Sequence, residues 1–395
     1  MGMEYRPFYL AGEWQQSGHE VVIIAASQAH VRSKQVELSA DSQEETIEGI
    51  RYFWVKTPPY EGNGIGRIRN MKAFVGFLKK NAKSIAEKFS PDVVIASSTY
   101  PLDNYPAHKI ARYAGAKYFY EVHDLWPLSP KELGGMPAWH PFILWMQIAE
   151  NYAYKHVDGV ISMLPKTKEH MKSHGLDLNK WNYVPNGILM QDWQEVEPVG
   201  NDIALKLKEI KKNFSKIIAY TGSFGLANAL DNFIIAASGM KEKDIAFVLV
   251  GSGPEKQNLL NLSEKLNSKN VFFIDSVPKT QIPDLLSYFD YLYIGLQKQS
   301  LFRFGISPNK LIDYMMSSKP VIQAIDAGNN MVKEAGCGIS IAPEDPKELV
   351  KACEELMVLS KEDLEAMGER GRNFVLLNHD YKVLAKKFIL AIEKA

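Results

Sequence analysis

The feature that most constrains this chain is a recurring order of a short apolar run, a polar or glycine-rich turn and a helical segment. Short apolar runs bounded by turns are typical of parallel strands that are buried on both faces. Their alternation with helices predicts doubly wound α/β domains. The runs lie at 91–97, 117–122, 159–163, 216–221, 246–250, 271–274, 290–294 and 321–325.

The length of 395 residues is more than one hydrophobic core usually serves, so we expect two domains. The sequence Pro185-Asn186-Gly187 interrupts the strand–helix alternation. We place the boundary there, with an N-terminal domain over 1–185 and a C-terminal domain over 186–380.

Charge and cysteine content exclude several classes of protein. The formal net charge is zero, which gives no overall attraction to nucleic acid. Cys337 and Cys353 are the two cysteines, so neither a disulfide framework nor a zinc site is indicated. We find no apolar run of about 20 residues and no signal-peptide pattern, and we expect a cytoplasmic protein.

The stretch 304–325 has the features of an anion site at the start of a helix. Gly305 lets a ligand approach the main chain, and Ser307 is expected to cap the helix that follows. The first amides of that helix, at Asn309 and Lys310, attract an anion, and Lys310 adds a full charge. Asp313 lies one turn later, where it either accepts a sugar hydroxyl or pairs with Lys310.

Two glycine turns follow strands of the second half and predict phosphate cradles. Gly222, Ser223 and Gly225 follow the run 216–221, and Gly251 and Gly253 follow the run 246–250. Each turn leads into a helical segment, so backbone amides can point at a phosphate.

The run 117–122 ends in His123-Asp124-Leu125-Trp126-Pro127. Carboxyl ends of parallel strands are where such folds bind ligands. We therefore expect His123 to contact a sugar hydroxyl, Asp124 to contact the acceptor and Trp126 to form a wall. The alternatives are that His123 caps backbone and that Trp126 only turns the chain.

These motifs together resemble retaining nucleotide-sugar glycosyltransferases of family 4 with the two-Rossmann (GT-B) architecture. The resemblance is to the capsule and O-antigen branch, similar to N-acetylfucosaminyltransferases. It rests on the E-x-H-D-x-W-P string from Glu121 to Pro127, the G-x-G-P turn at Gly251 and a pattern around Lys310. That pattern comprises Ser307, Pro308, Lys310, Leu311, Asp313, Tyr314, Met315, Lys319, Pro320, Val321 and Ile322.

The resemblance implies a donor site in the C-terminal domain and an acceptor site in the N-terminal one. His123, Asp124 and Lys310 are the implied catalytic residues, and Val277 would border the nucleotide base. Glu4, Arg6 and Trp126 are expected on the acceptor side, and residues 381–395 are expected to pack on the N-terminal domain. The implied donor residues are Gly222, Ser223, Gly225, Gly251, Gly253, Val277, Gly305, Ser307, Asn309 and Asp313.

This chain departs from the family pattern at three positions. The first of two family glutamates falls on Gly305, and an arginine and a lysine that contact the diphosphate fall near Phe224 and Asn228. Lys310, Arg303 or Lys298 would then supply the missing charge. No D-x-D metal motif stands at a strand end, so we expect neither a metal nor another cofactor to be required.

The N-terminal region is also unusual for a doubly wound domain. A helix at 7–17 precedes the strand at 21–26, whereas such a domain begins with a strand that lies in the middle of the sheet. We expect that the first strand is missing and that the recorded start is internal to the natural reading frame, or that the chain is truncated.

Two helical segments bear on membrane association. The segment 66–89 carries a basic face, which suits either an anionic membrane or simple solvation around a packed core. The segment 139–154 is rich in aromatic residues, which suits either core packing or a membrane-dipping surface. We expect a cytoplasmic protein that is peripheral to the membrane.

The predicted activity is transfer of a sugar from a nucleotide diphosphate donor to a polyprenyl-diphosphate-linked glycan. The resemblance favours UDP and an acetamido-deoxy sugar. One alternative is a UDP-sugar 2-epimerase, which shares the two-domain architecture. Another is a catalytically silent nucleotide-binding protein.

Overall fold

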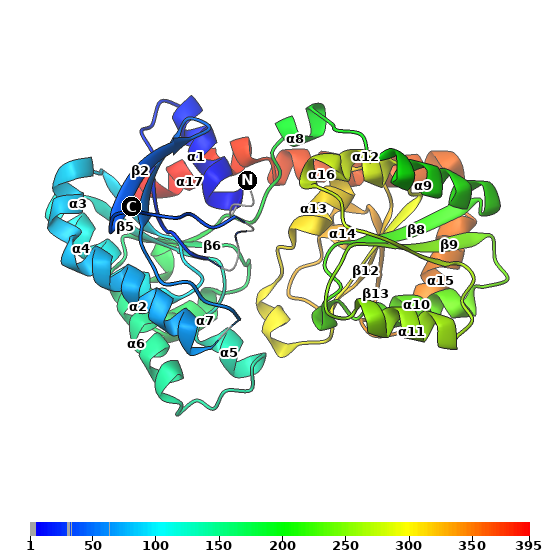
Figure 1. Ribbon diagram of the computed structural model, residues 1–395, viewed down its shortest axis with the longest axis horizontal. Helices are drawn as coiled ribbons and strands as arrows, with labels where there is room; N and C mark the ends of the chain where they lie inside the picture. Colours follow the sequence, from blue (N-terminus) through cyan, green and yellow to red (C-terminus); the bar gives the residue numbers. More distant parts are fainter. Residues whose placement is uncertain (1–4, 30–31, 33, 63) are drawn as a thin grey trace. The chain divides into compact units, whose positions relative to one another are not determined.

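The computed structural model describes residues 5–29, 32, 34–62 and 64–395. The chain forms two compact α/β units, which are described separately below (Figure 1). The N-terminal unit comprises 1–186 and 381–395, and the C-terminal unit comprises 187–380. The sequence-based boundary after Pro185 lies one residue from the division after Asn186.

The C-terminal unit contains a six-stranded sheet in the order β10-β9-β8-β11-β12-β13, and every neighbouring pair is parallel. The order reverses between β8 and β11, which is the switch point where doubly wound folds bind ligands. The strands are β8 (Lys216–Thr221), β9 (Ile245–Val250), β10 (Val271–Ile274), β11 (Tyr291–Gly295), β12 (Val321–Ala324) and β13 (Gly338–Ile341).

Helices cover both faces of this sheet because alternate strand residues point to opposite faces. In β8, Ile217 and Ala219 join one core, whereas Ile218 and Tyr220 join the other. The first core includes α9 (Asn201–Asn213), α12 (Ile282–Ser287), α13 (Asn309–Met316), α14 (Met331–Ala335) and α16 (Lys361–Asn378). The second includes α10 (Leu230–Gly239), α11 (Lys256–Lys265) and α15 (Pro346–Met357). Figure 1 shows these two layers of helices, and α8 (Gln191–Gln194) precedes them in the chain.

One helix of this unit, α9, has only a weak signal in the sequence. The segment 194–213 has little visible pattern because lysines interrupt it, yet it forms the 13-residue helix α9. Leu207 and Ile210 are buried on its inner face, three residues apart. Packing against the sheet therefore outweighs the weak local signal.

The strands of the N-terminal unit form two sheets within the described residues. In one, of order β1-β3-β2, β1 is parallel and β2 antiparallel to β3. The other has the order β4-β5-β6-β7 and is parallel throughout. Strands β1 and β4 are edge strands of these two separate sheets. The strands are β1 (Val22–Ala26), β2 (Ser42–Ile47), β3 (Ile50–Val55), β4 (Val93–Ala96), β5 (Lys117–Val122), β6 (Gly159–Ser162) and β7 (Trp181–Tyr183).

The segment 66–89, which the sequence predicted to be one basic helix, forms two helices that are divided at Asn81. The Asn81 side chain and backbone both donate to the Phe77 carbonyl, at 2.9 and 3.0 Å. Such a side chain competes with the helical hydrogen-bond ladder and ends the first helix. The helices of this unit are α1 (Tyr5–Gln16), α2 (Ile65–Lys80), α3 (Ala82–Phe89), α4 (Asn104–Ala114), α5 (Leu128–Glu132), α6 (Pro141–His156), α7 (Lys168–Ser173) and α17 (Tyr381–Lys394).

The last helix, α17, packs against α1. Trp14 donates from Nε1 to the Ala385 carbonyl at 3.2 Å, and its ring meets Phe388 edge to face at 5.0 Å. Tyr9 contacts Tyr381 at 5.2 Å between ring centroids. The two ends of the described chain thus share one unit, as the family resemblance implied for residues 381–395.

No helix in the described part of the chain combines the length and the apolar character needed to cross a membrane. Cys337 and Cys353 are both buried and free, and burial raises the pKa of each thiol to about 12. Their burial fits a packing role.

Candidate functional site

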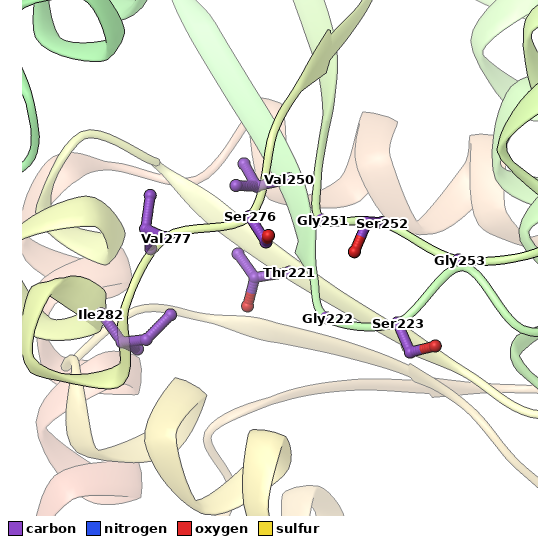
Figure 2. Close-up of a pocket in the computed structure, with 10 residues that line it drawn as sticks. All are labelled: Thr221, Gly222, Ser223, Val250, Gly251, Ser252, Gly253, Ser276, Val277 and Ile282. Carbon is purple, nitrogen blue, oxygen red and sulfur yellow. The ribbon is translucent and has the colours of Figure 1, made fainter. Parts of the chain in front are cut away.

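A pocket of about 380 Å³ lies at the carboxyl ends of β8, β9 and β10 in the C-terminal unit (Figure 2). The sequence predicted Gly222, Ser223, Gly251, Gly253 and Val277 as donor-binding residues, and the structure brings all five to this pocket. The remaining lining residues are Thr221, Val250, Ser252, Ser276 and Ile282.

The two glycine turns approach each other too closely for side chains. A Cβ at Gly251 would lie 1.9 Å from the Gly222 carbonyl oxygen, and one at Gly253 would lie within 2.7 Å of the Phe224 backbone. Phe224 donates from its amide to the Ser252 carbonyl at 2.7 Å, which ties the turns together. Among the described residues, the amides of Ser223 and Gly253 donate to no other group. They are therefore available to an anion, as a phosphate cradle requires.

Lys310 lies beside the first of these turns. Its Nζ donates to Tyr220 Oη at 2.6 Å and to Asn228 Oδ1 at 3.0 Å, and it stands 4.4 Å from the Tyr220 ring centroid. It is also 3.2 Å from where a Cβ of Gly222 would be. Burial lowers the pKa of the Lys310 ammonium to about 8. The site thus holds a partly desolvated cation next to free amides.

Of the three cations considered as replacements for the family's arginine and lysine, Lys310 is the one beside the cradle. Arg303 donates to the Ser300 carbonyl and stacks over Phe304, and Lys298 lies 3.7 Å from Asp326. Asn228 takes part by accepting from Lys310. Phe224 is fully buried and contributes no charge.

The loop before α13 differs in detail from the prediction. Gly305 is buried with φ 103°, a conformation that favours glycine. Pro308, not Ser307, occupies the N-cap position, and no side chain caps the helix. Asn309 is exposed at the first turn. Gly225, Gly305, Ser307 and Asn309 do not line the pocket.

Tyr314 anchors α13 to the end of β8. Its Oη accepts from the Thr221 amide at 2.7 Å and donates to the Thr221 carbonyl at 3.1 Å. In the sequence, Tyr314 stands out only as part of the family pattern around Lys310. This contact explains how Lys310, one turn earlier in α13, is held beside Gly222.

Asp313 does not pair with Lys310, whose Nζ is bonded elsewhere. The Asp313 carboxyl is half-buried, and burial raises its pKa to about 7. Lys279 and Asp192 form a nearby ion pair, 3.3 Å apart. Lys279 lowers the pKa of Asp313, and Asp192 raises it. No hydrogen bond of this carboxylate is seen within the described residues, so it is available to a ligand hydroxyl.

We predict that Asp313→Asn stabilises the protein at pH 8 and has little effect at pH 4. The folded-state pKa is raised above the unfolded value of 3.8, so the native form binds this proton more tightly and loses stability as pH rises through that interval. The asparagine removes a penalty on the order of 2 kcal/mol above pH 7. Thermal unfolding at the two pH values measures this, and an equal shift at both would contradict it.

In the N-terminal unit, His123 belongs to a buried polar network centred on Glu121. Arg6 donates from Nε to Glu121 Oε1 at 2.9 Å, and Ser97 donates to Glu121 Oε2 at 2.5 Å. His123 Nε2 lies 3.0 Å from Glu121 Oε2 and 2.9 Å from Ser97 Oγ. Because Ser97 gives its one proton to Glu121, the proton on His123 Nε2 points into this network. The Nε2 edge of His123 is therefore not the edge offered to a ligand.

Burial raises the pKa of Glu121, but the Arg6 guanidinium and His123 outweigh it and hold that pKa well below its usual range. Arg6 also donates to the carbonyls of Val184 and Pro185. Its side chain is 4% exposed. Arg6 thus uses donors on all three guanidinium nitrogens inside the unit, and its predicted contact with an acceptor stays a prediction. Glu4 lies outside the described residues.

Asp124 and Trp126 organise the loop after β5. Asp124 Oδ1 accepts from the Leu125 amide at 2.9 Å and from Ser129 Oγ at 2.6 Å, and Oδ2 accepts from Trp126 Nε1 at 3.3 Å. Both carboxylate oxygens thus accept hydrogen bonds within the loop, and the predicted contact of Asp124 with an acceptor stays a prediction. The Trp126 ring contacts Phe142, with 5.9 Å between ring centroids, and the Arg67 guanidinium, which lies 5.3 Å from the Trp126 ring centroid.

Sequence reasoning missed the partners that hold the key side chains. Tyr220 and Asn228 orient Lys310, and Glu121 and Ser97 orient His123. Glu121 belongs to the E-x-H-D string, and a carboxylate within the apolar run 117–122 was the signal that the sequence offered. Tyr220 gave no signal because it lies 90 residues from Lys310.

A different family model matches each of the two units. Residues 1–187 match the family model described as a glycosyl transferase 4-like domain, and residues 204–374 match the one described as glycosyl transferases group 1. A probable glycosyltransferase WbjE of Pseudomonas aeruginosa is 21% identical over 311 residues, covering 76% of this chain and 74% of the relative. The putative colanic acid biosynthesis glycosyl transferase WcaI of Escherichia coli K12 is 22% identical over 374 residues, covering 90% and 88%.

Solved structures of the same fold include sucrose-phosphate synthase from Thermosynechococcus elongatus, with TM-score 0.70, 14% identity and coverage of 96% of this chain and 90% of that one. WaaG, a glycosyltransferase involved in lipopolysaccharide biosynthesis, aligns with TM-score 0.65, 15% identity and coverage of 97% and 94%. Anabaena Alr3699/HepE in complex with UDP-glucose aligns with TM-score 0.63, 14% identity and coverage of 88% and 87%. The predicted two-domain GT-B fold is confirmed.

Proposed function

Since this chain is a glycosyltransferase with a glycosyl transferase 4-like domain and a glycosyl transferases group 1 domain, we propose that it uses a UDP-sugar to extend a lipid-linked glycan. The donated sugar is an acetamido-deoxy sugar, and its anomeric configuration is retained. The product enters surface polysaccharide synthesis. The relatives WbjE and WcaI, and WaaG among the structures, support this setting.

The observation that carries the proposal is the contact of Lys310 with the glycine cradle. Nζ of Lys310 lies 2.6 Å from Tyr220 Oη and beside Gly222. Gly222 lines the pocket together with Ser223 and Gly253, whose amides are free within the described residues. A diphosphate fits this combination of one cation and fixed N–H donors. Val277 and Ile282 give the pocket an apolar edge that suits a nucleotide base.

The chemistry follows from where charge develops. As the bond from the anomeric carbon to the diphosphate breaks, negative charge grows on the leaving phosphate oxygens. Fixed amides and the Lys310 ammonium then stabilise the transition state more than the bound donor. The acceptor hydroxyl attacks the anomeric carbon and its proton passes to the departing group. Asp313 is proposed to accept a donor hydroxyl. Acceptor recognition is assigned to the N-terminal unit, at the loop after β5.

Calorimetry with UDP and GDP, followed by mass spectrometry of lipid products made from UDP-sugars, tests the proposal. We expect UDP to bind more tightly than GDP and a glycosylated lipid to appear with free UDP. A nucleotide sugar that is only isomerised would favour a 2-epimerase instead. Binding of UDP with no turnover of any donor would favour a silent nucleotide-binding protein.

The proposal includes peripheral binding to an anionic membrane through α6 and α2. Leu144 and Ile148 lie one turn apart on α6 and are 51% and 62% exposed, and Trp139 just before this helix is 74% exposed. On α2, the exposed Lys72 stands 5.3 Å from the ring of Trp145 in α6. An apolar stripe beside basic groups is the pattern of a helix that lies in a membrane interface.

We predict that Leu144→Glu with Ile148→Glu weakens binding to anionic vesicles by about 10-fold or more, because two apolar side chains lose their burial and two negative charges face the lipid. Vesicle sedimentation measures the effect. The matched control is Val358→Glu with Leu377→Glu, which changes two apolar side chains that are 82% and 73% exposed on the C-terminal unit. Equal loss in both double variants would remove this surface from the proposal.

A further inference from the structure

The side chains of Glu150, His170 and His174 form a cluster in the N-terminal unit that the proposed sugar transfer does not use. One ligand atom from each lies within 4.8 Å of the other two. We propose that this cluster binds one divalent transition-metal ion, with Zn²⁺ as the best match. The ion would connect α6 to α7.

The secondary structure brings the three residues together. His170 lies in α7 and His174 is its C-cap, four residues later, so both rings project from the same side of the helix. Their ring centroids are 4.4 Å apart. Glu150 comes from α6 and is 1% exposed, and the His170 side chain is 10% exposed. A buried carboxylate beside two imidazoles at this spacing is a recognised kind of ligand set.

The distances fit a bound ion better than direct hydrogen bonding. His170 Nε2 lies 3.5 Å from Glu150 Oε1, beyond the usual range for an N–H···O bond. Two ligands about 2.1 Å from one tetrahedral ion lie roughly 3.4 Å apart. An ion can therefore be placed between these two atoms with little movement of either side chain.

Neighbouring groups orient the ligands as they do in metal sites. Gln147 donates to Glu150 Oε2 at 2.7 Å, and Tyr154 donates to Glu150 Oε1 at 3.0 Å. His174 Nδ1 lies 2.8 Å from the His170 carbonyl oxygen, which can only accept. Nδ1 therefore carries the proton, and the lone pair needed for a metal is on Nε2.

The ligand types select the ion. Two imidazoles and one carboxylate favour zinc-like metals over Mg²⁺ and Ca²⁺, which prefer all-oxygen sites. His174 is half-exposed, so water can complete four-coordination. From its two cysteines and the lack of a D-x-D motif at a strand end, the sequence indicated no metal site. This cluster uses neither and belongs to a different unit from the donor pocket.

The test is a titration of the metal-stripped full chain with Zn²⁺ against a chromophoric chelator, with Co²⁺ absorption as a report on geometry. We expect one equivalent bound, a tetrahedral Co²⁺ spectrum and a rise in melting temperature on adding Zn²⁺. His174→Ala should lower the affinity by about 100-fold or more, since even outer partners of metal ligands contribute up to that much.

The control is His156→Ala, which removes an exposed histidine of α6 outside the cluster and should leave binding unchanged. If His174→Ala fails to fold by circular dichroism, Glu150→Gln keeps the shape of the side chain and serves instead. Absence of saturable Zn²⁺ binding to the wild type, or equal binding by both histidine variants, would overturn the proposal. None of these readouts depends on glycosyltransferase activity.

Discussion

Lys310→Ala is expected to lower kcat/KM for the nucleotide sugar by about 10-fold to 1000-fold, the scale of one charge-assisted contact. The variant removes the one cation that lies beside Gly222 among the three considered, and leaves Tyr220 and Asn228 without their shared donor. UDP affinity should fall as well, because in the proposed donor site the ammonium contacts the diphosphate both before and after transfer. Steady-state kinetics and calorimetry measure the two effects.

The pH dependence of UDP binding provides a second measurement on the same lysine. Its pKa is about 8 in the free protein, and a bound anion favours the charged form. Affinity should therefore be highest below pH 8 and weaken as pH rises through and beyond it. Lys310→Ala should lose this dependence.

Lys298→Ala is the matched control, because Lys298 is 72% exposed and pairs with Asp326 on the surface of the same unit. It should leave kinetics and UDP affinity unchanged. Unaltered kinetics in Lys310→Ala would show that the diphosphate binds elsewhere and would remove the main support for the proposed donor site.

Arg6→Met is expected to destabilise the N-terminal unit by about 3–5 kcal/mol, the usual effect of removing one partner of a buried ion pair. Glu121 would keep its charge, at 3% exposure, without the guanidinium that compensates it. The carbonyls of Val184 and Pro185 would also lose donors. Thermal unfolding should show a fall in melting temperature on the order of 10 °C.

Two further variants separate charge from packing. Arg6→Met combined with Glu121→Gln removes both charges and should recover part of the loss. Arg51→Met removes an exposed arginine that pairs with Glu20 and Glu44, and should cause no measurable change. In Arg6→Met the Glu121 carboxyl should become easier to protonate. The stability of this variant should therefore approach that of the wild type as pH falls toward 4. A difference in stability between wild type and Arg6→Met that does not change with pH would indicate that the variant loses packing and not charge compensation.

The Arg6→Met prediction also bears on His123. Glu121 accepts from Arg6 and also lies 3.0 Å from His123 Nε2, so we expect Arg6→Met to act on the position of His123 through Glu121. This separation matters because the family resemblance implied a ligand contact for both residues, His123 as a catalytic residue and Arg6 on the acceptor side. The structure assigns Arg6 to support and leaves the contact of His123 with a sugar as a prediction.

Much of the donor pocket was predictable because it is made by local geometry. A strand followed by a glycine turn exposes backbone amides wherever it occurs, so Gly222, Gly251 and Gly253 were identified without knowledge of the fold. The start of α13 was equally local, and only the cap differed, with Pro308 in place of Ser307. Helix α9 was missed because its burial depends on a sheet that begins after it in the chain.

The sequence by itself determined the order of strands and helices, the glycine turns and the presence of a lysine at a helix start. Tertiary structure alone decided which groups meet: Lys310 with Tyr220, Arg6 with Glu121, and Glu150 with His170. The physical reason is the range of the interactions. Backbone conformation depends on neighbouring residues, whereas the burial and pairing of a charge depend on groups that the sheet topology brings together from distant parts of the chain.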